Sequence, residues 1–360
     1  MRVVQIINSF GHHSGGAERL AQDLHFDLLA AGIDAHLVAL ETCDTSGLQN
    51  ATSLGFATPY KLGAILALRK YLKRLSLKPD LIHAHLFPTS AHVALLKTFG
   101  LIPCPAIFTE HNTSNRRREK AFFKPLDRAL YRKFSKIYCI SDGTRTALLG
   151  AYPHLQHKTH VITNGATLRF DRILKRKAGT KINILSVGRL ARQKNYSAAL
   201  QAIAMLEADI NYTILGEGTE RADLEALAQS LGISGNVAFE GHKPDITPFI
   251  EDADIFLIPS LWEGFGLAAV EGMNAGLPVV ASDIDGLREV VGRDGACALL
   301  VPPSEPEAIA TALKALIDDT QRRQAMGAAA FERSKLFDKR LMTEAYIAAY
   351  QTLGREAAHV

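Results

Sequence analysis

Two glutamates flank a glycine-rich stretch in the sequence SLWEGFGLAAVEG, which begins at Ser260. Glu263 precedes this stretch and Glu271 follows it; the stretch itself consists of Gly264, Phe265, Gly266 and Leu267. A helix that starts near Phe265 would leave its first N–H groups without intrahelical partners, and such helix ends favour phosphate. Glycine lets a ligand approach the backbone closely. The stretch therefore predicts a phosphate-binding helix start.

The two carboxylates need a different partner, because a carboxylate aimed at a phosphate would repel it. An ionised carboxylate accepts hydrogen bonds from hydroxyl groups, and sugars offer many of them. A nucleotide sugar carries hydroxyls on both sides of its diphosphate, on the ribose and on the sugar. The spacing of Glu263 and Glu271 thus indicates a nucleotide-sugar ligand.

Short β-branched runs alternate with amphipathic stretches such as 17–31 and 65–75. This alternation is typical of parallel sheets covered by helices on both faces. It pauses over the polar, basic segment 164–181 and then restarts, which predicts two Rossmann-like halves. The predicted strands are 3–7, 35–40, 81–84, 106–109, 137–140, 161–163, 182–187, 212–215, 237–239, 255–258, 278–281 and 298–301.

Length and composition agree with two ordinary globular domains. The chain has 360 residues, 47% of them apolar and 22% charged, and a formal net charge of +4. Its four cysteines are scattered without a CxxC pair. This argues against a zinc site or a disulfide framework and agrees with a reducing compartment. No apolar run approaches the roughly 18–20 residues of a membrane span. We expect a cytoplasmic protein without a signal peptide.

Other nucleotide-binding motifs fit poorly. The nearest match to the dinucleotide fingerprint is Gly216-Glu-Gly218, where Arg221 stands in place of the third glycine. This disfavours a nicotinamide-dependent dehydrogenase. The sequence contains no Walker A motif, which disfavours a P-loop ATPase.

Four stretches in order resemble family 4 of the retaining glycosyltransferases. They are GGAER at 15–19, TEHN at 109–112, VGRLARQKN at 187–195 and the Glu-x7-Glu block around 263–271. The resemblance implies an α/β GT-B fold, two Rossmann-like domains with parallel sheets facing across a cleft. We expect an acceptor domain over 1–163, a linker over 164–181 and a nucleotide-sugar domain over 182–337. The final helix, about 338–360, would cross back onto the first domain.

The resemblance also implies roles for individual residues. Arg189 and Lys194 follow a predicted strand, where α/β proteins place ligand contacts; alone they could equally be solvated surface cations. Within this family they would hold the diphosphate together with the amides of Gly266 and Leu267. Glu271 would bind the ribose, and Glu263 and His111 would orient the sugar. Gly15 and Gly16 would let the first loop lie near the donor phosphates.

The implied reaction is metal-independent transfer of a sugar, most simply from a UDP-sugar, with retention of configuration. The acceptor would be a hydroxyl of a glycan or of a lipid-linked acceptor, as in lipopolysaccharide or polysaccharide biosynthesis. No cofactor is expected, because the nucleotide sugar is a substrate. Asp252-Ala-Asp254 spells a DxD motif, but its place before a predicted strand favours capping over a metal site. The alternatives left open are a nucleotide-sugar epimerase of the same fold and a catalytically silent binding module.

The segment 116–136 carries nine basic residues against Glu119 and Asp127. Apolar residues interleave with these charges, namely Phe122, Phe123, Leu126, Leu130, Tyr131 and Phe134. We expect this amphipathic surface to meet anionic lipid at the inner membrane face. The alternative is a solvated helix whose apolar stripe packs on the first domain. Nucleic acid is not an expected partner, because no recognised binding motif accompanies the cluster.

Overall fold

The computed structural model describes residues 1–11, 15–113, 116–174 and 181–358. The chain folds as two compact units, the first formed by Met1–Thr163 and Arg340–Val360, the second by Asn164–Lys339. The described part of the segment predicted as a linker, 164–174, belongs to the second unit. There the side-chain oxygen of Asn274 accepts the backbone N–H groups of Arg169 and Phe170 at 2.8 and 3.0 Å.

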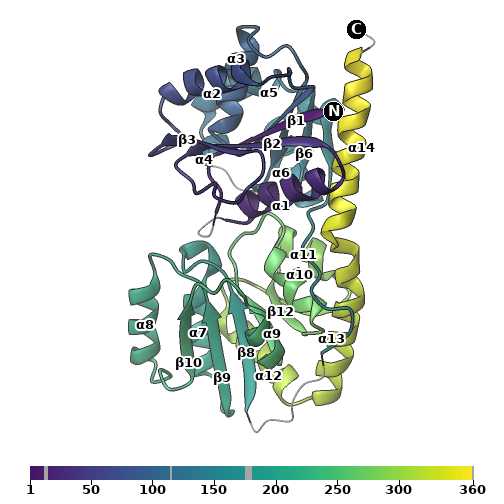
Figure 1. Cartoon of the computed structure of the whole chain (residues 1–360). Coiled ribbons are helices and arrows are strands. Elements are labelled where there is room, and N and C mark those ends of the chain that lie inside the picture. The colour runs from purple at the N-terminus through teal and green to yellow at the C-terminus, as the bar shows by residue number, and fades with distance from the viewer. Residues whose placement is uncertain (12–14, 114–115, 175–180, 359–360) are drawn as a thin grey trace. The chain divides into compact units, whose positions relative to one another are not determined.

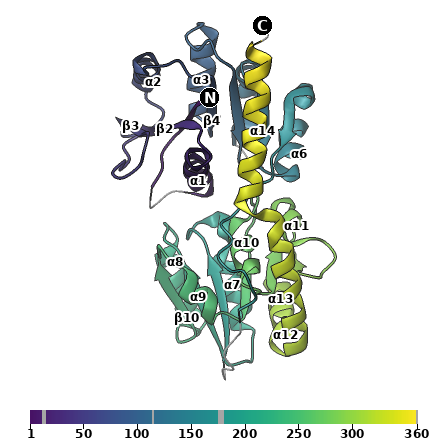
Figure 2. The same ribbon diagram turned by 45° about the vertical axis from the view of Figure 1, so that its right-hand side comes forward.

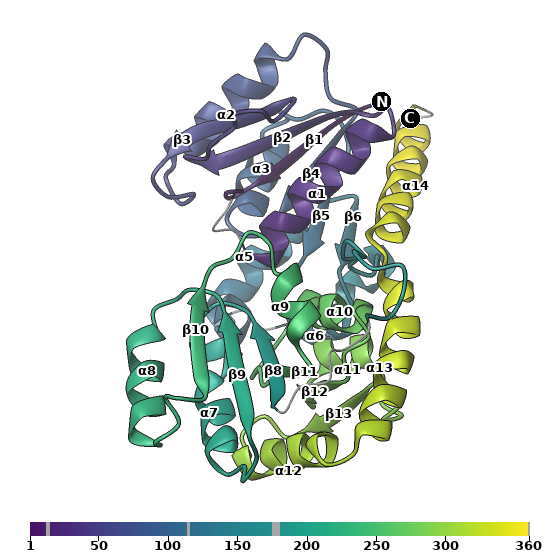
Figure 3. The same ribbon diagram turned by 60° about the horizontal axis from the view of Figure 1, so that its bottom comes forward.

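The first unit is built on a parallel sheet whose seven described strands have the order β3-β2-β1-β4-β5-β6-β7. Each strand lies parallel to its neighbour, and Figure 3 shows β3, β2 and β1 side by side. The strands are β1 (Arg2–Ile7), β2 (Asp34–Glu41), β3 (Ala51–Phe56), β4 (Leu81–His85), β5 (Ala106–Glu110), β6 (Lys136–Cys139) and β7 (Thr159–Val161).

Helices cover both faces of this sheet, as alternating apolar strands require. One face packs against α2, α3, α5 and α6, and the other against α1 and α14. The helices are α1 (Gly16–Ala30), α2 (Gly63–Arg74), α3 (Thr89–Thr98), α4 (Arg116–Glu119), α5 (Lys124–Tyr131), α6 (Asp142–Ala151) and α14 (Lys339–Ala358).

Helix α14 packs on the first unit, although it is the last element of the chain (Figures 1 and 2). Its Tyr350 hydroxyl lies 2.7 Å from His83 Nδ1, and its Tyr346 hydroxyl lies 3.0 Å from Thr109 Oγ1. The second His83 nitrogen lies 2.7 Å from the same Thr109 oxygen. Two strands and the C-terminal helix are therefore tied together by buried polar contacts.

The second unit contains a parallel sheet whose six described strands have the order β10-β9-β8-β11-β12-β13. One apolar core lies between this sheet and α7, α8 and α12. On the other side, α10 approaches β11 closely, since a Cβ on Gly272 would lie 2.7 Å from the Phe256 ring. The strands are β8 (Ile182–Val187), β9 (Ile210–Leu215), β10 (Val237–Gly241), β11 (Ile255–Ile258), β12 (Val279–Ser282) and β13 (Ala298–Val301).

The helices of the second unit alternate with these strands, and the last two follow the final strand. They are α7 (Tyr196–Ala204), α8 (Arg221–Ser230), α9 (Thr247–Asp252), α10 (Leu267–Asn274), α11 (Asp285–Val291), α12 (Pro306–Ile317) and α13 (Thr320–Ser334). The α/β class with two parallel sheets is confirmed. The sequence did not predict one strand, β3, over ATSLGF. This strand lies at the edge of the sheet and is only partly buried, and it has no apolar run of the kind that reveals a central strand.

Among the described helices, none is both long and apolar enough to cross a bilayer.

Buried histidines of the first unit, among them His83, His85 and His111, make its stability depend on pH. Burial lowers the pKa of His83 and His85 well below the usual value, and that of His111 to about 3. Below about pH 6.5 the unfolded chain takes up protons that the folded chain refuses, so stability is lost as the pH falls. Each histidine should contribute a slope of up to about 1.4 kcal/mol per pH unit.

Urea unfolding at pH 7.5, 6.5 and 5.5 measures this slope. The free energy of unfolding should decrease toward pH 5.5, and His83→Gln should reduce the slope because one titrating group is gone. Equal stability at the three pH values would contradict the expected burial of neutral imidazoles.

Candidate functional site

The order of strands in the second sheet reverses at β8, which lies between β9 and β11. Open α/β sheets bind ligands at such a point, beyond the carboxyl ends of the strands. Arg189 and Lys194 follow β8, and Glu263 follows β11. Residues about seventy positions apart in the sequence are thus brought to one edge of one sheet.

Lys194 and Glu263 form an ion pair, with Nζ 2.5 Å from a carboxylate oxygen. The two side chains are 20% and 10% exposed, so their charges are only partly screened by water. From the sequence, Lys194 is expected to bind the diphosphate and Glu263 the sugar, and no local pattern indicates that the two side chains touch. Because of this ion pair, removal of either side chain also changes the charge balance at the other.

The Glu263 carboxylate is held by its own loop as well. Ser260 Oγ donates a hydrogen bond to it at 2.8 Å, and Gln193 Nε2 donates a longer one at 3.4 Å. The backbone is equally constrained, because a Cβ on Gly286 would lie 2.4 Å from the Glu263 carbonyl oxygen. The Glu263 carboxylate is therefore held in one orientation.

Arg189 differs from Lys194, because its residue is exposed. Within the part of the chain that the structure describes, its guanidinium has no salt-bridge partner. The two predicted cations are therefore not equivalent. Arg189 offers a charge that is available to an incoming anion, whereas Lys194 shares its charge with Glu263.

Gly216 and Gly218 allow the loops after β8 and β9 to touch. A Cβ on Gly216 would lie 2.0 Å from the Gly188 carbonyl oxygen, and one on Gly218 would lie 2.1 Å from that of Leu190. Backbone hydrogen bonds close the contact, including Leu190 N–H to Glu217 O at 2.9 Å. The glycines that imitate a dinucleotide fingerprint thus serve backbone packing here.

The predicted helix start near Phe265 is wrong by two residues. Helix α10 begins at Leu267, after Gly266, which adopts the left-handed conformation with φ 97°. A side chain at 266 would also lie 2.6 Å from Leu287, so glycine is required on two counts. Phe265 is buried, with its ring 5.4 Å from that of Phe337. Its side chain belongs to the core and not to a ligand surface.

The later start of α10 changes which backbone N–H groups lie at its N-terminal end. The amides of Leu267 and Ala268 come first, whereas the Ala269 N–H already donates to Gly266 O at 2.9 Å. Gly264 and Leu267 are half-buried, and so is Glu271 in the second turn of α10. Glu263 and Glu271 remain on either side of the helix start, as their spacing predicts.

In the first unit, Gly15 caps helix α1 and Gly16 is its first residue. A Cβ on Gly15 would lie 2.9 Å from the Glu18 carboxylate, so Glu18 lies over the N-terminus of its own helix. This position complements the positive end of the helix dipole. The preceding loop residues 12–14 lie outside the described residues.

His111 follows β5 and is almost fully buried, at 5% exposure. Its Nε2 lies 3.2 Å from His85 Nδ1, whereas Nδ1 has no hydrogen-bond partner among the described residues. The neighbouring Glu110 forms a buried ion pair with Arg118 and accepts the Asn112 N–H at 3.2 Å. Glu110 thus fixes the loop that carries His111.

His83, His85 and Gln5 are buried polar residues that the sequence motifs do not indicate as candidates. They lie on the central strands β4 and β1, and each is fully buried. The signal was present in LIHAH, since two histidines in a strand between apolar residues must find polar partners when buried. Only the sheet order showed that those partners lie on β1 and β5.

The basic segment is divided between core and surface. Arg117 pairs with the buried Asp127 and stacks 3.5 Å from the Phe87 ring centroid, and Arg118 pairs with Glu110. These two arginines are structural, so the expectation that they are surface cations is wrong. Leu130, Tyr131 and Phe134 are buried, as the packing alternative predicts, whereas Phe122 and Leu126 are 86% and 62% exposed.

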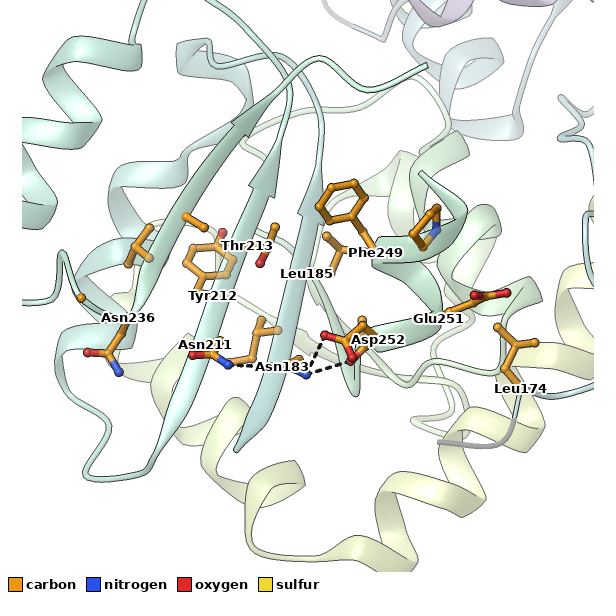
Figure 4. Close-up of a pocket in the computed structure, with 16 residues that line it drawn as sticks. Leu174, Asn183, Leu185, Asn211, Tyr212, Thr213, Asn236, Phe249, Glu251 and Asp252 are labelled. Atoms are coloured by element: carbon orange, nitrogen blue, oxygen red, sulfur yellow. Dashed lines mark hydrogen bonds between the residues drawn. The ribbon is translucent and has the colours of Figure 1, made fainter. Parts of the chain in front are cut away.

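The DxD motif lies at the other end of the second sheet. Asp254 accepts the Asn183 N–H at 2.9 Å, and Asp252 accepts its side-chain amide at 3.1 Å. Asp252 borders a groove of about 770 Å³ along the amino-terminal halves of β8 and β9 (Figure 4). These bonds favour a capping role. Because ligands of parallel sheets bind at the carboxyl ends, this groove is not the candidate site.

Comparison with known proteins supports the interpretation of both units. The family described as "Glycosyl transferases group 1" matches residues 169–333, and "Glycosyltransferase Family 4" matches residues 14–170. A D-inositol 3-phosphate glycosyltransferase of Corynebacterium urealyticum is 30% identical over 294 residues, covering 73% of this chain and 68% of that protein. The lipopolysaccharide core biosynthesis glycosyltransferase LpsE of Rhizobium meliloti is 27% identical, covering 62% and 66%.

The chain spans about half to two thirds of the length of several curated relatives, for example 54% of a 2-deoxystreptamine glucosyltransferase of Streptomyces kanamyceticus. Among solved structures, Anabaena HepE in complex with UDP and glucose superposes with a TM-score of 0.83 at 19% identity, covering 97% of this chain and 99% of that one. This similarity concerns the fold. The matched family descriptions, the relative from Corynebacterium urealyticum and the two parallel-sheet units together show that the chain belongs to the group 1 glycosyltransferases of the GT-B fold.

Proposed function

We propose that the chain transfers a sugar from a nucleoside diphosphate sugar to a hydroxyl group of a glycan or lipid-linked acceptor. The observation that carries this proposal is the Lys194–Glu263 pair beside the exposed Arg189 at the reversal of the second sheet. The matched relatives include a lipopolysaccharide core glycosyltransferase, which favours a glycan acceptor. A UDP-sugar is the proposed donor, because the structure of HepE with a similar fold holds UDP and glucose.

Each group would act on a different part of the donor. Arg189 and the first amides of α10 bind the diphosphate, and Glu271 accepts hydrogen bonds from the ribose hydroxyls. Glu263 orients the sugar, held in place by Ser260 and Lys194. The two cations stabilise the negative charge that develops on the departing diphosphate, a role that a metal ion fills elsewhere.

The proposed chemistry proceeds with retention of configuration. The acceptor hydroxyl attacks the anomeric carbon from the face that the diphosphate leaves, so one carbon–oxygen bond forms while another breaks. The proton of the hydroxyl passes to an oxygen of the leaving phosphate. No side chain is assigned as a covalent nucleophile, and Glu263 is already engaged by Lys194.

The two cations should respond differently to substitution. Arg189→Ala removes a charge aimed at the diphosphate, so turnover should fall roughly 100-fold while the melting temperature stays unchanged. Lys194→Ala should lower turnover similarly and also destabilise the fold, because it removes the counter-ion of a nearly buried carboxylate. Steady-state kinetics and thermal unfolding measure both effects.

Lys181 provides a matched control, since its pair with Asp209 at 2.8 Å lies at the opposite end of β8. Lys181→Ala should leave turnover within about twofold, as expected for an exposed pair. Addition of EDTA should leave the turnover of the wild type unchanged. Loss of activity in EDTA that manganese restores would refute metal-independent transfer.

The two glutamates can be separated by calorimetry with UDP. Glu271→Ala should weaken UDP binding, because the ribose loses a hydrogen-bond acceptor worth about 1–3 kcal/mol. Glu263→Ala should preserve or tighten UDP binding while transfer falls, because it releases the positive charge of Lys194. Equal weakening by both substitutions would show that the assigned roles are wrong.

We propose further that the surface of α5 and its preceding turn binds anionic lipid. The exposed Phe122 and Leu126 are accompanied by four exposed cations, namely Lys120, Lys124, Arg128 and Arg132. Apolar side chains flanked by cations favour the interface of an anionic bilayer. Such a surface would bring the enzyme to a lipid-linked acceptor.

Vesicle co-sedimentation tests this surface. Binding to anionic vesicles should weaken with salt and fall when all four cations become glutamine, each cation contributing about 1 kcal/mol near the surface. A matched variant with glutamine at Lys70, Lys73, Arg74 and Lys78, which are also exposed, should bind like the wild type. If the wild type ignores anionic vesicles at low salt, the membrane proposal fails.

A further inference from the structure

The loop that carries Glu263 is bonded along its length to the segment that follows β8. The Gln193 carbonyl oxygen accepts the Leu261 N–H at 2.8 Å, and Gln193 Nε2 donates to the Trp262 carbonyl oxygen at 2.8 Å. The same Nε2 lies 3.4 Å from a carboxylate oxygen of Glu263. Gln193 therefore contacts both the backbone of this loop and the side chain that the loop presents.

Asn195 joins the segment after β8 to two further loops. Its Nδ2 donates to the Pro259 carbonyl oxygen, directly after β11, at 3.1 Å. The same nitrogen donates to the Pro303 carbonyl oxygen, after β13, at 2.7 Å. The amide thus uses both of its hydrogens. Loops that follow three different strands of the second sheet meet at this one side chain.

The orientation of both side-chain amides follows from their neighbours. Their partners are backbone carbonyl oxygens and one carboxylate, so every partner is a hydrogen-bond acceptor. A flipped amide would place its own oxygen against these oxygens. The donating nitrogens of Gln193 and Asn195 must therefore face the loop.

The backbone of Asn195 allows neighbouring side chains to reach the same loop. Asn195 adopts the left-handed conformation, with φ 53° and ψ 39°, directly before α7. Asparagine tolerates this conformation better than most residues that carry a Cβ. Lys194 holds one end of the loop at Glu263, and Asn195 holds the other end at Pro259. Gly188 leaves room for the lysine, because a Cβ there would lie 2.9 Å from Lys194 Cε.

We propose that Gln193 and Asn195 are positioning residues that fix the loop after β11 and so keep Glu263 in the orientation that sugar transfer requires. This inference rests on the proposed function, in which Glu263 orients the sugar. Loss of either amide should spare nucleotide binding, since Arg189, Glu271 and the first amides of α10 are assigned to the nucleotide. It should lower kcat, because a small displacement of an orienting group is costly for the chemical step.

Transfer kinetics and calorimetry with UDP test this role. Asn195→Gly keeps the left-handed backbone but removes both side-chain bonds, and Gln193→Met keeps the length of the side chain but not its donor. Each should lower kcat roughly 10- to 100-fold, while the Kd for UDP stays within about threefold. Asn183→Ala is the matched control, because it removes an amide that donates to Asp252 O at 3.0 Å at the amino end of β8. It should change neither value.

Trp262 provides a measurement of the loop that does not depend on activity. It is the single tryptophan of the chain, it lies within the loop, and it is 39% exposed. In the ligand-free full chain, Asn195→Gly and Gln193→Met should lower the fluorescence anisotropy of Trp262 and increase its quenching by acrylamide. Asn183→Ala should leave both signals unchanged.

The outcomes separate this inference from the proposed function. Wild-type Trp262 signals in both variants, or UDP binding that weakens in step with kcat, would overturn the positioning role. A more mobile Trp262 with unchanged kcat would also overturn it, since the loop would then be held without effect on transfer. If the wild type transfers sugar from none of the nucleotide donors, the proposed function fails, whereas the Trp262 signals still decide whether the two amides hold the loop.

Discussion

Parallel pairing of all the described strands is the constraint from which both candidate sites follow. It places every carboxyl end of a sheet on one edge, so loops that are distant in the sequence must meet there. In the second unit this edge brings Lys194 to Glu263. In the first unit it places His111, after β5, next to His85 at the end of β4. The same backbone geometry thus assembles an ionic site in one unit and an imidazole chain in the other.

The two sites differ in the charge of their buried polar side chains. The ion pair of the second unit keeps a charged carboxylate in place at the sheet edge where the exposed Arg189 also lies. The imidazole chain of the first unit is neutral, because full burial disfavours the charged form of each histidine. The first arrangement is ionic, whereas the second is neutral and can only donate or accept hydrogen bonds.

Tertiary packing also explains why the basic segment was partly misinterpreted. Its composition gave no means of separating Arg117 and Arg118 from the other cations, since all are basic residues in one amphipathic stretch. Their acidic partners, Asp127 and Glu110, lie ten and eight positions away and are buried. Only the folded loop shows that these two charges are used internally, whereas Lys120, Lys124, Arg128 and Arg132 are exposed.

The sequence by itself determined the α/β class, most strand positions and the motifs that carry the site, because apolar periodicity and glycine placement are local properties. It also indicated the carboxylates Glu263 and Glu271 and the cations Arg189 and Lys194. Tertiary structure decided the rest: which charges are paired, where helix α10 begins, and which histidines contact one another. These features depend on contacts between residues far apart in the chain, and no local pattern specifies such contacts.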